Sequence, residues 1–286
     1  MALFYVPSLV SGNVLPEEES QHAVKVLRLQ AGDSITVVDG AGGFYKARIT
    51  IPHPKHCTFE ITETLLEYGK RDYHLHIAIA PTKNMERLEW FVEKATEIGI
   101  DEITPVVCRF SERKVIKAER LEKIIVSASK QSVKAYFPLL NPLCSLDELI
   151  RKCRETQKFI AHCYTSPPTP LLEERGAEAE SLEDSFADRK LMKNELKRSL
   201  QTNLLKERGA EAESLEDSLT DRKLLQYEIK KSSDVLILIG PEGDFSKEEV
   251  QKALSAGFIP VSLGDSRLRT ETAGVVACHT VAMINQ

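Results

Sequence analysis

Short apolar runs separated by turn residues are the dominant pattern of the first 70 residues. Strand-like runs, rich in β-branched residues, cover Ser34–Val38, 44–50 and Thr58–Leu65, and glycine-rich or proline-rich turns separate them. This rhythm is typical of a small β-barrel. Before it, residues 17–29 carry apolar side chains at helical spacing and stop near Gly32. We therefore predict a first domain over residues 1–70.

From residue 74 onward the pattern changes to an alternation of apolar strands and amphipathic helices. Strand-like runs cover 74–80, 102–108, 235–240 and 259–263, and helical spacing covers 87–98, 118–132, 246–256 and 273–284. Such alternation predicts an α/β domain, with a mostly parallel sheet and helices on both faces. We assign it to residues 71–286. Trp90 lies between Leu88 and Phe91 on the first of these helices and is expected in the core.

A polar duplication interrupts the second domain. Residues 174–185 read ERGAEAESLEDS, and residues 207–218 repeat the same twelve letters. Two copies are too few for a repeat fold, which needs about three units to bury its apolar faces. We expect residues 170–225 to form a solvated helical or disordered insertion. A partner-docking arm is the alternative.

Composition and charge narrow the class of protein. No apolar run approaches the roughly 20 residues of a membrane-spanning helix, and the N-terminus lacks the features of a secretory signal. We therefore expect a cytoplasmic protein without a membrane partner. The six cysteines are scattered without metal-ligand spacing, which favours reduced thiols and no metal. The net charge of −5 does not favour nucleic-acid binding, but the whole excess comes from residues 173–218.

The segment with the most chemical information joins a buried strand to a helix through a glycine turn. Residues 235–246 read VLILIGPEGDFS, and Ser246 with Glu249 forms a capping box. Ligands of open α/β sheets bind where strands end, and glycines there let the backbone approach them closely. Glu242 and Asp244 would repel a phosphate, and no phosphate-loop pattern is present. A cationic or neutral ligand is favoured, and a sulfonium cofactor is one such ligand.

A second polar segment follows the last predicted strand. Residues 262–273 read SLGDSRLRTETA and lead into an apolar helix. Thr270 or Thr272 would serve as the N-cap of that helix. Arginine side chains this close to a strand end favour a site, where they would contact RNA phosphate or hold a developing negative charge.

Together these segments resemble a known signature. Gly240-Pro-Glu-Gly243, followed by Leu263-Gly264 and by residues 268–273 (LRTETA), is similar to the signature of the knotted SPOUT-class methyltransferases. More narrowly, it resembles the ribosomal RNA small subunit methyltransferase E family. Matching pieces at 22–33, 83–99, 103–105, 111–113 and 131–132 extend the resemblance over nearly the whole chain except residues 170–225.

The resemblance implies a fold and a reaction. The C-terminal domain would contain a deep trefoil knot and form a homodimer, and the N-terminal barrel would be PUA-like and help to hold RNA. The reaction would transfer a methyl group from S-adenosylmethionine to N3 of a uridine in 16S ribosomal RNA of the small subunit. General topology rules predict an ordinary doubly wound sheet instead, because knots are rare.

Site residues follow from the matched motifs. For the cofactor we expect Ile239, Gly240, Pro241, Glu242, Gly243, Leu263, Gly264, Leu268, Thr272 and Ala273, and for RNA we expect His22, Arg28, Lys83, Lys94 and Arg113. N3 of uridine bears a proton at neutral pH, so its methylation requires that the resulting negative charge be stabilised. We hypothesise that Arg269 stabilises the anionic uracil while Thr270 or Glu271 orients the base.

The sequence departs from the family pattern at three places. Asp244 stands where many members have a second glycine, Ser266-Arg267 replaces a commoner Arg-Ile pair, and the duplication has no counterpart.

Three alternative functions are considered beside the methyltransferase that the resemblance implies. They are a non-catalytic RNA-binding protein, a SPOUT methyltransferase that acts on a different RNA base, and an ordinary nucleotide-dependent enzyme. Absence of phosphate-loop motifs argues against the last of these.

Overall fold

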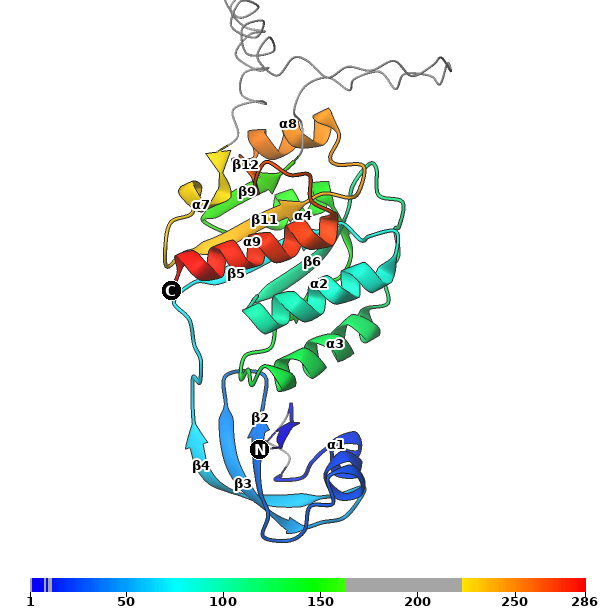
Figure 1. The fold of residues 1–286 in the computed structure, drawn as a ribbon, viewed down its shortest axis with the longest axis vertical. Helices are drawn as coiled ribbons and strands as arrows, with labels where there is room; N and C mark the ends of the chain where they lie inside the picture. Colours follow the sequence, from blue (N-terminus) through cyan, green and yellow to red (C-terminus); the bar gives the residue numbers. More distant parts are fainter. Residues whose placement is uncertain (1, 8, 10–11, 163–222) are drawn as a thin grey trace, which may run out of the picture. The chain divides into compact units, whose positions relative to one another are not determined.

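A computed structural model describes residues 2–7, 9, 12–162 and 223–286 (Figure 1). The duplicated repeats at 174–185 and 207–218 lie outside the described residues, and so does Cys163. The described residues form two sheets, each with its own hydrophobic core.

The N-terminal sheet contains the three strands that the sequence predicts and one that it does not. It consists of β1 (Leu3–Tyr5), β2 (Ser34–Val38), β3 (Phe44–Ile51) and β4 (Thr58–Leu65), in that order. β1 pairs parallel to β2, and the other pairs are antiparallel. Alternate side chains of the strands, among them Ile35, Val37 and Ile49, point into one core.

The helix expected over 17–29 is shorter than the sequence suggests. α1 (Glu17–Gln21) continues into a π-helical turn, His22–Val26. Arg28 has a φ of 57°, in the left-handed region, which a right-handed helix does not tolerate. The helix therefore ends before Arg28.

The second sheet confirms the predicted parallel architecture. Its strands are β5 (His74–Ile79), β6 (Glu102–Val107), β7 (Leu139–Leu140), β8 (Cys144–Ser145), β9 (Gln157–Ala161), β10 (Lys223–Leu224), β11 (Asp234–Ile239) and β12 (Ile259–Ser262). Seven of them run in the order β10-β12-β9-β11-β5-β6-β7, and β8 pairs with β6. Every pairing is parallel, so the carboxyl ends of the strands share one edge.

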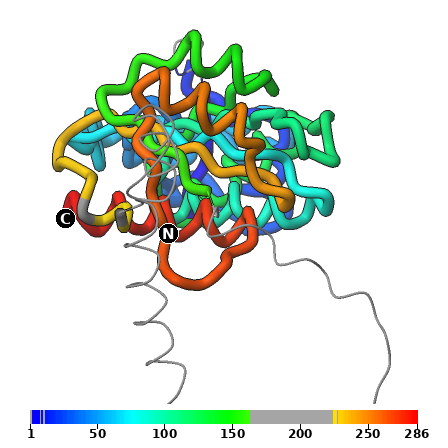
Figure 2. Tube along the Cα trace, turned by 90° about the horizontal axis from the view of Figure 1, so that it is seen from above, coloured from blue at the N-terminus to red at the C-terminus, as the bar shows by residue number. Residues whose placement is uncertain are grey.

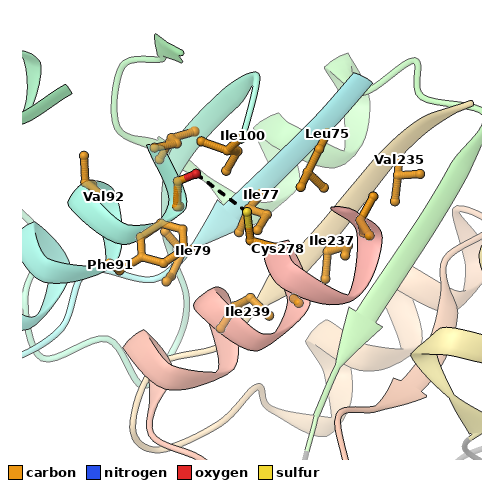
Figure 3. Close-up of a cluster of buried hydrophobic side chains, with 14 of the residues drawn as sticks. Leu75, Ile77, Ile79, Phe91, Val92, Ile100, Val235, Ile237, Ile239 and Cys278 are labelled. Atoms are coloured by element: carbon orange, nitrogen blue, oxygen red, sulfur yellow. Dashed lines mark hydrogen bonds between the residues drawn. The ribbon is translucent and has the colours of Figure 1, made fainter. Parts of the chain in front are cut away.

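Helices cover both faces of this sheet. On one face lie α2 (Met85–Ile98), α3 (Ala118–Gln131), α7 (Leu225–Glu228) and α9 (Thr270–Ile284), and on the other lie α4 (Leu146–Lys152) and α8 (Lys247–Ser255) (Figures 1 and 2). Leu75, Ile77 and Ile79 of β5 pack into the α2 and α9 face, as Figure 3 shows, while His76 points to the opposite face.

Close packing between α2 and α9 depends on small residues. A Cβ atom on Gly274 of α9 would lie 2.6 Å from the Phe91 ring of α2, so only glycine fits. Four residues further on, the Cys278 thiol lies 3.8 Å from the Ala95 carbonyl oxygen, within hydrogen-bonding distance (Figure 3). α9 is therefore seated directly on α2 and on β5.

The prediction that Trp90 is buried in the core is wrong. The buried side of α2 consists of Leu88, Phe91, Val92, Ala95 and Thr96, and Trp90 faces outward with 43% of its surface exposed. In the described ranges none of the helices is long and apolar enough to cross a membrane. The five described cysteines are free thiols, as expected.

Candidate active site at the carboxyl edge of the sheet

A cavity of about 230 Å³ lies at the carboxyl edge of the parallel sheet. It is lined by the ends of β9 and β11, by the loop after β11, and by the segment that leads into α9. The lining residues are Ala161, Ile239, Gly240, Pro241, Glu242, Asp244, Arg267, Leu268, Arg269, Thr270 and Ala273. The two segments singled out from the sequence thus meet around one cavity, as expected for a site in an α/β fold.

Local hydrogen bonds shape the loop after β11. The Asp244 N–H donates to the Pro241 carbonyl at 2.9 Å, and the φ of Asp244 is 64°. Glycine is the usual residue at positive φ, and aspartate is one of the few others that tolerate it. Asp244 therefore adopts a backbone conformation that is also open to glycine. Ser246 then begins α8 with the predicted capping box, in which its N–H donates to Glu249 at 2.9 Å.

The segment between β12 and α9 forms the second wall of the cavity and projects outward as a loop in Figure 2. Gly264 has a φ of 128°, which side-chain-bearing residues rarely adopt. The Arg267 guanidinium donates to the Glu242 carbonyl at 3.4 Å. This bond connects the second wall to the first.

Thr270 makes the firmest link between the two walls. Its buried hydroxyl donates to the Gly240 carbonyl at 3.0 Å. The prediction that Thr270 or Thr272 caps the helix is wrong, since Arg269 is the N-cap residue and makes no capping hydrogen bond through its side chain. The Thr270 hydroxyl donates to the Gly240 carbonyl on the other wall and does not cap α9.

Charges of both signs surround the cavity. Glu242 and Asp244 bring two carboxylates, and Arg267 and Arg269 bring two guanidinium groups. Arg269 is exposed, and it makes no ion pair with any of the described residues. A cavity with apolar patches and separate positive and negative groups suits a ligand that carries both an ammonium or sulfonium group and a carboxylate.

Not every predicted site residue reaches the cavity. Gly243 packs against the loop after β6, where a Cβ atom would lie 2.9 Å from the Phe110 Cβ. Leu263 packs against the core, and Gly264 and Thr272 do not line the cavity. The sequence also missed Ala161, Asp244 and Arg267 as lining residues.

Glu271 points toward α2 and away from the cavity. It is 7% exposed, and one of its carboxylate oxygens lies 3.8 Å from the Arg87 Nε atom. Its other oxygen is buried without a hydrogen-bond partner among the described residues. This position favours a structural role for Glu271, in which it holds the start of α9 against α2. It does not favour contact with a base in the cavity.

Two of the five predicted RNA contacts lie beside the site. The Lys83 N–H donates to Glu242 at 3.0 Å, and the Arg113 guanidinium donates twice to the Lys83 carbonyl, at 3.2 and 3.0 Å. Phe110, in the same loop as Arg113, is 46% exposed and was not identified from the sequence. The sequence signal that could have pointed to Phe110 is the position of an aromatic residue directly before the motif at 111–113.

The other three predicted RNA contacts lie elsewhere. His22 and Arg28 belong to the N-terminal part, where the His22 ring lies 6.1 Å from that of Phe4 and Arg28 is exposed. The Lys94 ammonium on α2 donates to Glu93 at 2.7 Å and to Glu97 at 2.9 Å. These partners partly neutralise Lys94.

Comparison with known proteins agrees with this architecture. Residues 70–183 and 189–282 match the model of an RNA methyltransferase domain, and residues 15–62 match that of an RNA methyltransferase PUA domain. Ribosomal RNA small subunit methyltransferase E of Rickettsia conorii is 23% identical over 98% of this chain and 94% of its own length. The Synechocystis protein of the same name is 26% identical, over 91% and 68%.

Solved structures of similar chains share the fold. A probable rRNA-methyltransferase from Porphyromonas gingivalis is 36% identical, covers 99% of both chains and superposes with a TM-score of 0.76. The small subunit methyltransferase E of Neisseria gonorrhoeae, solved with S-adenosyl methionine, has a TM-score of 0.70 at 23% identity over 100% of this chain and 98% of its own. The chain therefore belongs to the RNA methyltransferase family that includes the ribosomal RNA small subunit methyltransferases E.

Proposed function

We propose that the protein transfers a methyl group from S-adenosylmethionine to N3 of a uridine in 16S ribosomal RNA of the small subunit. The observation that carries this proposal is the cavity whose two walls are joined by the bond from Thr270 to Gly240. Its walls lie within the residues that match the RNA methyltransferase domain model, 70–183 and 189–282.

The cavity's residues suit the parts of the proposed cofactor. Ile239, Leu268 and Ala273 offer apolar contacts. The Glu242 and Asp244 carboxylates favour the ammonium and sulfonium charges, which Coulomb attraction stabilises. The cofactor supplies an electrophilic methyl group when bound. A methyltransferase from Legionella pneumophila was solved with the same cofactor.

Arg269 is the residue we assign to the methyl acceptor. Uracil must lose the N3 proton before N3 attacks a methyl group, and the negative charge of the N3 anion is shared with the two exocyclic carbonyl oxygens. A guanidinium without an ion-pair partner in the described ranges is suited to stabilise that charge. We assign Thr270 to positioning, through its bond to Gly240. A SPOUT methyltransferase that acts on a different RNA base is the alternative.

RNA would be held on both parts of the chain. We propose that residues 1–70 form the RNA-holding domain, with His22 and Arg28, and that residues 71–286 form the catalytic domain. Lys83 and Arg113 beside the cavity would contact phosphate through their charged ends: the exposed Lys83 ammonium, which is paired with Glu112 at 2.9 Å, and the Arg113 guanidinium. Phe110 would offer a stacking surface to a nearby base.

The topology supports a knot. β12 lies between β10 and β9, whereas the helix that follows it packs on β5 and β11. The connecting segment must therefore pass by the loop after β11, to which Thr270 is bonded. We infer that this crossing is the trefoil knot that the resemblance implies.

A homodimer through α9 is a further part of the proposal. The helix sequence, TETAGVVACHTVAMI, is apolar on nearly every side, although only one side packs on α2 and the sheet. Such a helix favours burial on its second side as well. Met283, on this helix, is 54% exposed.

Replacing Met283 by glutamate is expected to convert a dimer into a monomer, measured by sedimentation velocity. The charge would be buried without a partner at the interface. Ile51→Glu is the matched control, because Ile51 is 61% exposed on the N-terminal sheet. An unchanged dimer for Met283→Glu would contradict the assignment of α9 to the interface.

The decisive test of the proposed function is calorimetric titration with S-adenosylmethionine and S-adenosylhomocysteine. We expect both to bind the purified protein. Ribosomal RNA from a methylation-deficient strain should then gain 3-methyluridine, detected by nucleoside mass spectrometry. Absence of cofactor binding by folded protein, with and without RNA, would favour the non-catalytic RNA-binding alternative. A different methylated nucleoside would favour the alternative base.

A further inference from the structure

A second and larger cavity, of about 720 Å³, lies at the opposite edge of the parallel sheet. It is formed by the amino ends of β5, β6 and β11 together with α4 and the turn before β9. Its lining includes two imidazoles, four carboxylates and two thiols, all groups that bind metal ions. The proposed methyl transfer uses none of them.

Three of these side chains converge in the cavity. His76, Glu102 and Glu155 each place a ligand atom within 4.8 Å of the other two. His76 is only 3% exposed, and its Nδ1 atom lies 2.5 Å from a Glu155 oxygen. Its Nε2 atom lies 3.9 Å from a Glu102 oxygen. Glu155 faces Nδ1 and Glu102 lies on the Nε2 side of the ring, so an ion held by all three residues at the usual 2.0–2.2 Å of zinc would require side-chain rotation.

A second layer of hydrogen bonds holds these side chains in place. The Asn141 amide donates to Glu102 at 2.5 Å and to the Thr104 hydroxyl at 2.7 Å, and that hydroxyl lies 2.7 Å from His76 Nε2. The Arg154 N–H donates to the second Glu155 oxygen at 2.8 Å. Partners of this kind orient the ligands of metal sites, and an ion would replace the present contact between His76 Nδ1 and Glu155.

The charge of the cavity favours a cation. Its four carboxylates are those of Glu102, Glu148, Glu155 and Asp234, and its two positive side chains are Lys152 and Arg154. Lys152 is paired with Glu148 at 2.6 Å. These six side chains alone have a formal charge of −2. Carboxylates gathered in one cavity repel one another, and a divalent ion would lower that repulsion.

We propose that this cavity is a binding site for a divalent transition metal ion, with His76, Glu102 and Glu155 as ligands. Imidazole nitrogen is a common ligand of zinc, copper, iron and nickel, and zinc is the probe we choose. The remaining coordination positions would face the cavity, where water would complete the shell. Because the ligands come from β5, β6 and the turn before β9, the ion would cross-link three parts of the chain. The proposal does not depend on the methyltransferase reaction.

The test is a zinc titration of the full chain after treatment with a chelator, followed by calorimetry and by thermal unfolding. We expect one equivalent to bind and the unfolding temperature to rise, because an ion that binds the folded state stabilises it. Cobalt added in place of zinc should give visible absorption.

Two ligand variants, and a parent chain without His53 and His56, test whether zinc binds at this cavity. Glu155→Gln retains a hydrogen-bonding side chain and should bind zinc at least tenfold more weakly, and His76→Gln should lose binding. His53 and His56 stack on the N-terminal part and could bind zinc weakly, so the titration is repeated with both replaced by alanine. Unchanged stoichiometry and affinity in folded Glu155→Gln, or no binding by the parent chain, would overturn the proposal.

Discussion

Arg269→Ala is expected to lower the single-turnover rate of RNA methylation by about 10²- to 10³-fold, the usual cost of removing one donor from an anion-stabilising site. The guanidinium lies at the rim of the cavity and makes no ion pair with the described residues. Its removal should leave the developing uracil anion without its main positive partner. The rate is measured with saturating RNA and cofactor.

Two controls separate chemistry from binding in this experiment. Cofactor affinity of Arg269→Ala, measured by calorimetry, should stay within a few-fold of the parent value. Arg269→Lys keeps the charge but loses the planar fork of donors, so it should recover only part of the rate. If Arg269→Ala keeps nearly the full rate, the assigned role is wrong.

Gly240→Ala is expected to weaken binding of S-adenosylmethionine about ten- to hundredfold. A Cβ atom at Gly240 would lie 3.0 Å from the Phe245 ring, and Phe245 is only 1% exposed. Overpacking of this kind typically costs about 1–3 kcal/mol, here by displacing a wall of the cavity. Calorimetric titration measures the dissociation constant.

Gly257→Ala is the matched control for this substitution. Gly257 follows α8 and has a φ of 84°, so alanine is strained there, but the nearest atom to its Cβ is 3.7 Å away and the residue does not line the cavity. It should lose stability and retain cofactor affinity. Equal loss of affinity in both variants would mean that general destabilisation, and not the cavity wall, is responsible.

Sequence patterns predicted the elements that are determined by a few neighbouring residues. The capping box of Ser246 and Glu249 is contained in four residues, and the apolar run before Gly240 is long enough to indicate a buried strand. β9 was missed because only Phe159 and Ile160 of its five residues are fully buried. It becomes a central strand only through pairing with β11 and β12, which are distant in sequence.

The composition of the site was predictable, but its arrangement was not. Family motifs identified Gly240, Leu268, Arg269 and Thr270, all of which line one cavity. The orientation of Glu271 toward Arg87 depends on how α9 sits against α2, which no local pattern contains. Ala161 belongs to the unpredicted strand, so nothing in the sequence could place it at the cavity.

The bond from Thr270 to Gly240 has a consequence for how the protein meets its ligand. Because the hydroxyl is buried, the loop after β11 and the start of α9 are fastened together before anything binds. Ordering two separate loops would otherwise cost conformational entropy at the moment of binding. The cavity is thus preorganised, and most of the interaction energy of a ligand remains for affinity.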